Sequence, residues 1–185
     1  MADKNTIIQS AIALYKEKGL NFTMDDIAKD LHIAKKTIYR IFSSKEELLQ
    51  GIVEYGFDNI QENKKKILKE NIPYIDKLKK LLIAMPTDIE SIDFKQLEPL
   101  SIQYPSVSKS ISQHLQSNWE PVFDFIQEGI QQKILREVPL SMIEVIVTSS
   151  MNTLLSSSID EHTYQQSLQD LVDILLKGIL YEKNQ

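Results

Sequence analysis

Five side chains of types that can bind phosphates or base edges lie close together in the sequence: Lys35, Lys36, Thr37, Tyr39 and Arg40. Lysine and arginine neutralise phosphates, and hydroxyl groups bond to backbone oxygens. On a helix in the major groove, such side chains also reach the edges of bases. No acidic residue lies between positions 35 and 45, so the positive potential is confined to one surface. We therefore predict that this segment binds duplex DNA.

Two short amphipathic helices joined by a tight turn are predicted to position these side chains. The first begins after Thr23, whose hydroxyl can accept from the amide of Asp26. The apolar period is interrupted at residues 32–34 and then resumes, as expected for a second helix packed at an angle on the first. The residues that would share one small core are Ile27, Ala28, Leu31, Ile38 and Phe42.

Residues 11–48 resemble the DNA-binding region of the TetR family of bacterial transcriptional regulators. The matching residues are in register over about forty positions: Ala11, Tyr15, Gly19, Thr23, Ile27, Ala28, Thr37, Ile38, Tyr39, Phe42, Lys45, Glu46 and Leu48. Ala34, Lys36 and Ile41 depart from the family pattern, and Lys36 replaces a frequent glycine on the side that faces the groove. This lysine changes which phosphates and bases lie within reach.

The resemblance implies an all-α protein of two domains. Residues 1–45 would form an N-terminal three-helix, helix-turn-helix DNA-binding domain. Residues 46–185 would form a larger C-terminal helical domain for ligand binding and dimerisation. The implied function is a transcriptional regulator, a repressor that a small-molecule effector releases from its operator. The implied partners are a palindromic DNA operator and a second copy of the chain, in the cytoplasm and at the nucleoid when DNA is bound.

Within that function, the predicted DNA-binding residues have different roles. Tyr39 and Lys45 would hold phosphates, with Thr23 assisting at the start of the first helix. Lys35, Lys36 and Thr37 are better placed for bases. The full predicted set is Thr23, Lys35, Lys36, Thr37, Tyr39, Arg40 and Lys45. A partner-binding adaptor that has lost DNA binding would be expected to lack several of these residues.

The composition argues against several other classes of protein. The chain has 185 residues and a net charge of -5, yet residues 1–50 carry eight basic against seven acidic residues, so the acidic excess lies in the remainder. There is no cysteine, and His32, His114 and His162 lie far apart, so we expect no metal site and no cofactor. No apolar run approaches the roughly twenty residues needed to cross a bilayer.

An enzyme is not predicted either. The serines at positions 149, 150 and 156–158 lie in helices or at helix ends, without the strand-borne turn of a hydrolase nucleophile. Apolar spacing ending at Gly19 predicts a helix at 3–18, and Ser44 would cap a long helix at 45–70. Beyond it, the prolines divide the larger domain into predicted helices at 74–85, 88–104, 106–133, 140–157 and 163–183, with a kink near Trp119 caused by Pro121. We interpret Lys64–Lys66 as a solvated helix face rather than a second DNA contact.

The last two predicted helices are densely apolar. Their stripes contain Leu140, Ile143, Val147, Met151, Leu154, Leu155, Leu168, Leu171, Val172, Leu175, Leu176 and Ile179. Such stripes fit a monomeric core, or the four-helix dimer interface that the family resemblance implies. We favour the dimer, and on this interpretation a charged residue at Met151 or Leu175 would separate the two copies.

The family resemblance also implies a ligand cavity in the larger domain. The candidate lining residues are Tyr55, Phe94, Tyr104, Trp119, Phe123 and Met151. Aromatic residues and methionines at helical spacing also fit a plain core. Because the middle of the chain offers few charges that would be buried, we expect a largely apolar or mildly polar ligand.

Overall fold

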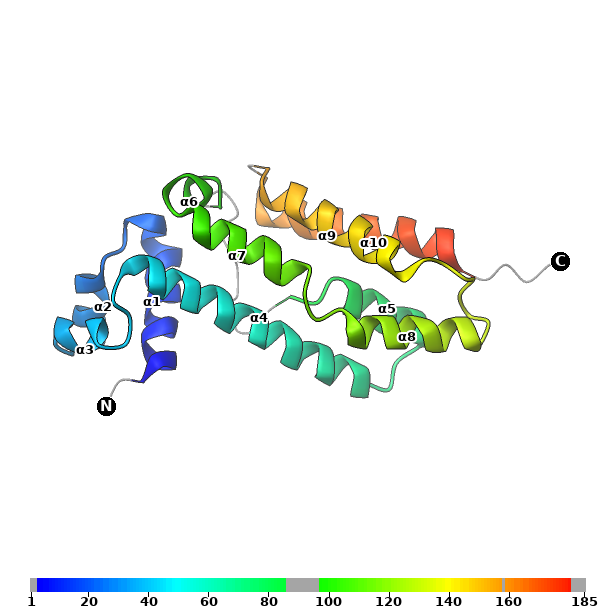
Figure 1. Ribbon diagram of the computed structural model, residues 1–185, viewed down its shortest axis with the longest axis horizontal. Helices are drawn as coiled ribbons and strands as arrows, with labels where there is room; N and C mark the ends of the chain where they lie inside the picture. Colours follow the sequence, from blue (N-terminus) through cyan, green and yellow to red (C-terminus); the bar gives the residue numbers. More distant parts are fainter. Residues whose placement is uncertain (1–2, 86–96, 158, 181–185) are drawn as a thin grey trace.

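The computed structural model describes residues 3–85, 97–157 and 159–180, and these residues form an elongated, helical molecule (Figure 1). A small group of short helices, which we call the head, lies at one end. It comprises α1 (Lys4–Lys18), the short 3-10 helix η1 (Gly19–Asn21), α2 (Met24–Asp30) and α3 (Lys35–Tyr39). The described residues contain no strand, only an isolated antiparallel bridge between Leu135 and Leu180. The all-α prediction is confirmed.

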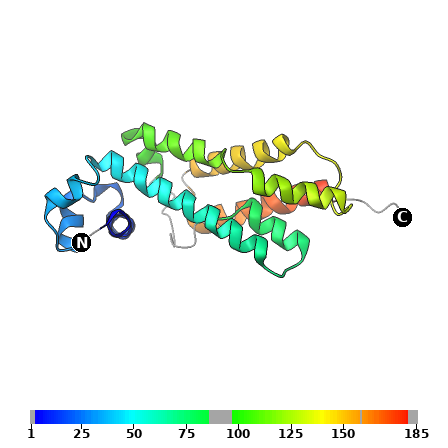
Figure 2. The same ribbon diagram turned by 60° about the horizontal axis from the view of Figure 1, so that its bottom comes forward.

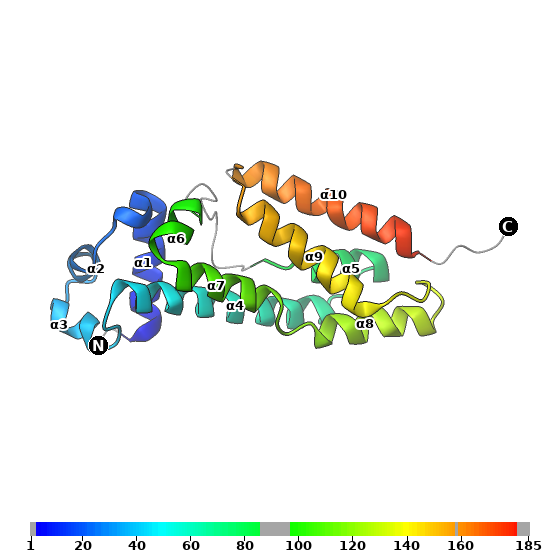
Figure 3. The same cartoon turned by 45° about the horizontal axis from the view of Figure 1, so that its top comes forward.

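The remaining helices form the larger part of the molecule. They are α4 (Lys45–Lys69), α5 (Tyr74–Leu82), α6 (Leu97–Gln103), α7 (Pro105–Leu115), α8 (Glu120–Gln131), α9 (Leu140–Leu155) and α10 (Glu161–Ile179). Figure 2 shows α4 running from the head along the molecule, and α5 turning back beside it. Figure 3 shows α9 and α10 lying side by side. None of the described helices is both long and apolar enough to cross a membrane.

Local sequence signals explain where many helices begin and end. Asp3, Thr23, Ser44 and Asp160 each accept a hydrogen bond from a backbone amide three residues ahead, which satisfies one free amide of the first turn. α1 ends at Gly19, whose φ of 56° is strained for most other residues. The predicted starts of α2 and α4 and the end of α1 are therefore confirmed.

The predicted helix at 106–133 is wrong, because two helices occupy this stretch. The chain leaves α7 after Leu115, and Asn118 adopts a left-handed conformation with φ of 60°. Pro121 lies in the first turn of α8, where its missing N–H has no intrahelical partner to lose. Most of the predicted helix at 88–104 lies outside the described residues, and α6 is its described part.

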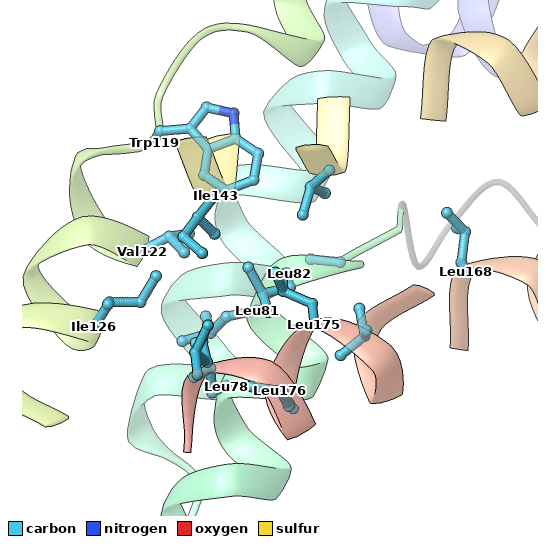
Figure 4. Packing of buried hydrophobic residues seen from close by; sticks show 14 of the residues in the cluster. Leu78, Leu81, Leu82, Trp119, Val122, Ile126, Ile143, Leu168, Leu175 and Leu176 are labelled. Atoms are coloured by element: carbon cyan, nitrogen blue, oxygen red, sulfur yellow. The ribbon is translucent and has the colours of Figure 1, made fainter. Parts of the chain in front are cut away.

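The apolar side chains pack into two clusters. The larger cluster joins α4, α5, α8, α9 and α10, and Figure 4 shows side chains such as Leu78, Trp119, Ile126 and Leu176 pointing toward one another. The head cluster contains the apolar faces of α1, α2 and α3, together with Leu48 and Leu49 at the start of α4. The head cluster therefore continues past residue 45, where the sequence suggested a domain boundary.

The apolar stripes of α9 and α10 face the interior of the protomer more than the sequence suggested. Met151 and Leu175 are 6% and 8% exposed, so a charge at either position would disrupt the protomer itself. The proposal to use them as dimer-splitting positions is therefore wrong. The large apolar side chains that are exposed on this helix pair are others: Met142, Val145, Ile146 and Ile174.

The three consecutive lysines of α4 also differ from the prediction of a solvated face. Lys65 and Lys66 are exposed, as predicted. Lys64 is buried, with 8% of its surface exposed. Only one of the three faces the larger domain, because consecutive residues on a helix point about 100° apart.

Candidate DNA-binding interface

The start of α2 is held by a reciprocal pair of hydrogen bonds between Thr23 and Asp26. The Asp26 amide donates to the Thr23 hydroxyl oxygen at 3.1 Å, and the Thr23 amide donates to the Asp26 carboxylate at 2.8 Å. The Thr23 hydroxyl also donates to this carboxylate at 2.7 Å. These bonds from Thr23, with a smaller contribution from Lys18, lower the pKa of Asp26 from 3.8 to about 2. Thr23 therefore fixes the first helix of the motif while remaining exposed.

The turn between α2 and α3 is tight. His32 has a φ of 51°, a left-handed conformation that is uncommon for residues other than glycine. The amides of Leu31 and Ile33 donate back to the carbonyls of Ile27 and Ala28, both at 3.0 Å. These bonds close the end of α2, and the chain then enters α3 after Ala34.

The second helix is anchored by Ile38 and Phe42, which are 0% and 2% exposed in the head cluster. On the other side, Lys35, Lys36, Tyr39 and Arg40 are exposed and Thr37 is half-buried. The structure therefore brings together these five predicted residues on α3 and its C-terminal cap. In Figure 1, α3 lies at the opposite end of the molecule from α8.

Lys35 is oriented before any DNA binds. Its ammonium lies 2.8 Å from the Asp25 carboxylate and 5.7 Å from the centre of the Tyr39 ring. The hydrogen bond with Asp25 raises the pKa of Lys35, which stays charged. An exposed pair of this kind is weak and can exchange Asp25 for a phosphate or a base.

Lys45 lies apart from this set, although the sequence grouped it with the phosphate-binding residues. Its ammonium donates to the backbone carbonyls of Leu20 and Phe22, the latter at 2.6 Å. It also lies 4.4 Å from the centre of the Phe22 ring. Partial burial lowers the pKa of Lys45, against a smaller opposing effect of Asp26. In this structure the Lys45 ammonium fastens α4 to the segment that precedes α2.

The head is also fastened to α6 and α7, which the sequence did not indicate. Leu100 and Val107 are 6% and 1% exposed and pack in the head cluster. The Ser106 hydroxyl donates to the Glu46 carboxylate and accepts a hydrogen bond from Gln50 at 3.4 Å. No local pattern identifies these contacts, because the partners of Ser106 lie 56 and 60 residues away in sequence.

The predicted ligand-lining residues separate into two groups. Tyr55 and Tyr104 pack against the head cluster, whereas Trp119, Phe123 and Met151 belong to the larger cluster. Phe94 lies outside the described residues. Other residues line three cavities. One of about 80 Å³ lies between α7 and α9, and one of about 360 Å³ lies along α9 and α10. A third, of about 700 Å³, lies between α4, α5 and α10.

Comparison with known proteins agrees with this arrangement of helices. Residues 7–52 match the family model described as "Bacterial regulatory proteins, tetR family". The chain is 26% identical to the uncharacterized HTH-type transcriptional regulator YvaF of Bacillus subtilis, over 94% of this chain and 93% of that protein. It is 32% identical to the biofilm operon icaADBC negative transcriptional regulator IcaR of Staphylococcus epidermidis, over 61% of each chain.

Solved structures share the fold along nearly the whole chain. A transcriptional regulator from Cytophaga hutchinsonii aligns with a TM-score of 0.73 at 23% identity, covering 95% of this chain and 97% of that one. A TetR transcription regulator from Haloarcula marismortui aligns with a TM-score of 0.71 at 15% identity, covering 96% and 97%. At these identities the likeness concerns the fold.

Proposed function

The chain belongs to the TetR family of bacterial transcriptional regulators, and on that premise we propose that it is a repressor whose head binds one half of a palindromic operator. The observation that carries this proposal is α3, whose buried anchors Ile38 and Phe42 leave its cationic side exposed. The IcaR relatives, which are negative regulators by name, favour repression over activation.

The exposed residues of the head would contact different parts of the DNA. We assign base contacts to Lys35, Lys36 and Thr37 at the start of α3, since the N-terminal residues of a recognition helix contact base edges. We assign phosphate contacts to Tyr39 and Arg40, assisted by Thr23 at the N-terminus of α2. Lys45 would support these contacts indirectly, through its bonds to the head's own carbonyls.

A second copy of the chain would cover the exposed apolar face of α9 and α10. This face includes Met142, Ile146 and Ile174, and a cavity of about 360 Å³ lies along it. A two-fold dimer would place two heads on successive major-groove faces about 34 to 36 Å apart, or a multiple of that distance. The operator would therefore be palindromic.

Replacing Ile174 by glutamate tests this dimer. Ile174 is 71% exposed, so the protomer should keep its fold, whereas a dimer would have to bury an unpaired charge. Sedimentation should show the unmodified protein as a dimer at micromolar concentration and I174E as a folded monomer. A monomeric unmodified protein would contradict the dimer.

A ligand in the larger domain would control DNA binding through α4. This helix begins in the head cluster at Leu48 and ends in the larger cluster at Ile67, so a shift of α4 moves both. A coupling of about 1–3 kcal/mol would change operator affinity about 5- to 150-fold, and the operator must weaken ligand binding by the same factor.

Selection from random duplexes tests the central proposal. The selected site should bind more tightly than a scrambled site of equal length at moderate salt. K36A should relax the preference at one base position, and a wrong contact there costs about 1–3 kcal/mol. Equal affinity for both duplexes would exclude sequence-specific regulation and favour a partner-binding adaptor. For any ligand that binds, equal affinity with and without operator would exclude ligand-controlled release.

A further inference from the structure

The cavity between α4, α5 and α10 has the size of a small-molecule site. Its volume of about 700 Å³ falls within the range of about 300–1,000 Å³ that is usual for such sites. It shares no lining residue with the cavity along the exposed apolar face of α9 and α10. The proposed dimer face therefore does not account for it.

Part of the lining of this cavity is apolar. Ile67 of α4 and Val172 of α10 are 4% and 1% exposed, and both belong to the larger cluster. Ile83, Ala84 and Met85, which directly follow α5, add three more apolar side chains to the lining. A ligand could therefore remove an apolar body from water against these side chains.

The charged part of the lining contains more acid than base. The charged residues are Glu70, Asp76, Lys79, Lys80 and Asp173. Three carboxylates and two ammonium groups give the lining a net charge of -1. The cavity therefore favours a ligand that carries one positive charge.

Each of the two lysines is already paired with a carboxylate. The Lys79 ammonium lies 2.6 Å from Asp173, and the Lys80 ammonium lies 2.6 Å from Glu70. The hydrogen bond with Asp173 raises the pKa of Lys79, and the nearby charge of Asp76 adds to this shift. Asp76 itself forms no ion pair within the described part of the chain. It is therefore the carboxylate that a cationic ligand could reach without displacing a lysine.

We propose that this cavity binds an organic monocation, an ammonium group on an apolar body, with the ammonium beside Asp76 and the body against Ile67 and Val172. This inference rests on the proposed ligand control and names the chemical class of the effector. It narrows the sequence-based expectation of a largely apolar or mildly polar ligand to one with a single positive charge.

A ligand in this position would contact the helix that reaches the head. Asn63 and Ile67 place the second half of α4 in the cavity wall, and the Asn63 amide donates to the Met85 carbonyl at 2.9 Å. The first half of the same helix contributes Leu48 and Leu49 to the head cluster. A ligand that favours one position of α4 would therefore act on both ends of this helix.

Calorimetric titration of the full-length protein tests the charge preference. The probes are 4-phenylbutylamine and decylamine, whose amines are protonated at pH 7, and the alcohols and carboxylates with the same apolar bodies. At least one amine should bind about threefold or more tightly than its alcohol, because an exposed charge pair contributes modestly. The matching carboxylate should bind more weakly than the alcohol. The proposal is overturned if neither amine binds or if amine and alcohol bind alike.

Two matched variants locate the site. D76N makes the lining neutral and should weaken binding of the amine about threefold, to the affinity of the alcohol. D124N removes an exposed carboxylate of α8 that lines none of the three cavities, and it should leave amine binding unchanged. Both positions are exposed, so both variants should melt at the unmodified temperature. Equal amine affinities of D76N and D124N would overturn the site.

A third variant should change the affinity in the opposite direction. K79Q removes the ammonium that is paired with Asp173 and leaves two carboxylates for the ligand, so the amine should bind about threefold more tightly. A merely structural role of these charges would not strengthen binding when one of them is lost. Unchanged or weaker amine binding by K79Q would overturn the site.

DNA binding distinguishes this inference from the proposed function. If an amine binds through Asp76 without changing operator affinity, the cation site stands and ligand-controlled release through this cavity fails. If neither amine binds but a neutral or anionic compound releases the operator, ligand control stands and the cation site is overturned.

Discussion

Replacing Lys45 by methionine should destabilise the head. The change removes the ammonium that bonds to the carbonyls of Leu20 and Phe22, and it removes the contact with the Phe22 ring. A hydrogen bond to a charged group is worth about 1.5–3 kcal/mol. Lys45 is only partly buried and water can replace part of each bond, so we expect a total loss of about 2–3 kcal/mol. This is a large share of the about 5–15 kcal/mol by which domains are stable.

Urea unfolding and the salt dependence of DNA binding together test this expectation. K45M should unfold at lower urea concentration, and at temperatures where it remains folded it should show the same salt slope as the unmodified protein. K36M is the matched control, because Lys36 is exposed on α3 and the structure gives it no ion pair among the described residues. K36M should unfold at the same urea concentration as the unmodified protein. The slope of the logarithm of its DNA-binding constant against the logarithm of salt concentration should be smaller by about one if Lys36 also approaches a phosphate.

The opposite result for Lys45 would refute the reasoning. If K45M unfolds at the same urea concentration as the unmodified protein but loses about one unit of salt slope, Lys45 binds a phosphate. The carbonyl contacts would then be a resting position that DNA displaces.

Two further predictions concern the stability of the motif. The pKa of Asp26 in the folded protein lies below its ordinary value, so the stability that this carboxylate contributes is present above about pH 4 and is lost as the pH falls through about 2. The urea concentration at the unfolding midpoint should therefore fall less between these pH values in D26N than in the unmodified protein. Equal falls in the two proteins would contradict the pairing of Asp26 with Thr23. H32G relieves the left-handed φ of 51° and should gain about 0.5–1 kcal/mol, seen as a higher melting temperature; a lower melting temperature would show that His32 makes compensating contacts.

The head was predictable because its signals are local. Thr23 and Ser44 cap helices through residues three positions ahead, and the apolar period around Ile38 fixes which side of α3 is exposed. The break at Asn118 was missed because no proline or glycine marks it, and Pro121 appeared to be the cause of a mere kink. Sequence spacing locates a capping residue, but it does not show which asparagine adopts a left-handed conformation.

The larger domain was less predictable because burial there depends on partners distant in sequence. Lys64 resembles Lys65 and Lys66 in every local respect, and only the helix facing it makes it buried. Similarly, Ile174 and Leu175 are neighbours of equal hydrophobicity, yet one is exposed and the other is in the core. A stripe that is apolar on several sides does not reveal which side meets the protomer and which is left for a second copy.

The packing of Leu100 and Val107 in the head cluster limits how DNA-binding specificity can be transplanted between regulators. A chimera cut at residue 45 would carry the exposed residues of α3 but leave behind Leu48, Leu49 and the side chains from α6 and α7 that complete the head cluster. The transplanted segment would expose apolar surface, or would meet foreign side chains of the wrong volume. A graft that preserves specificity should therefore change only the exposed positions of α3, and should leave the buried positions of the host in place.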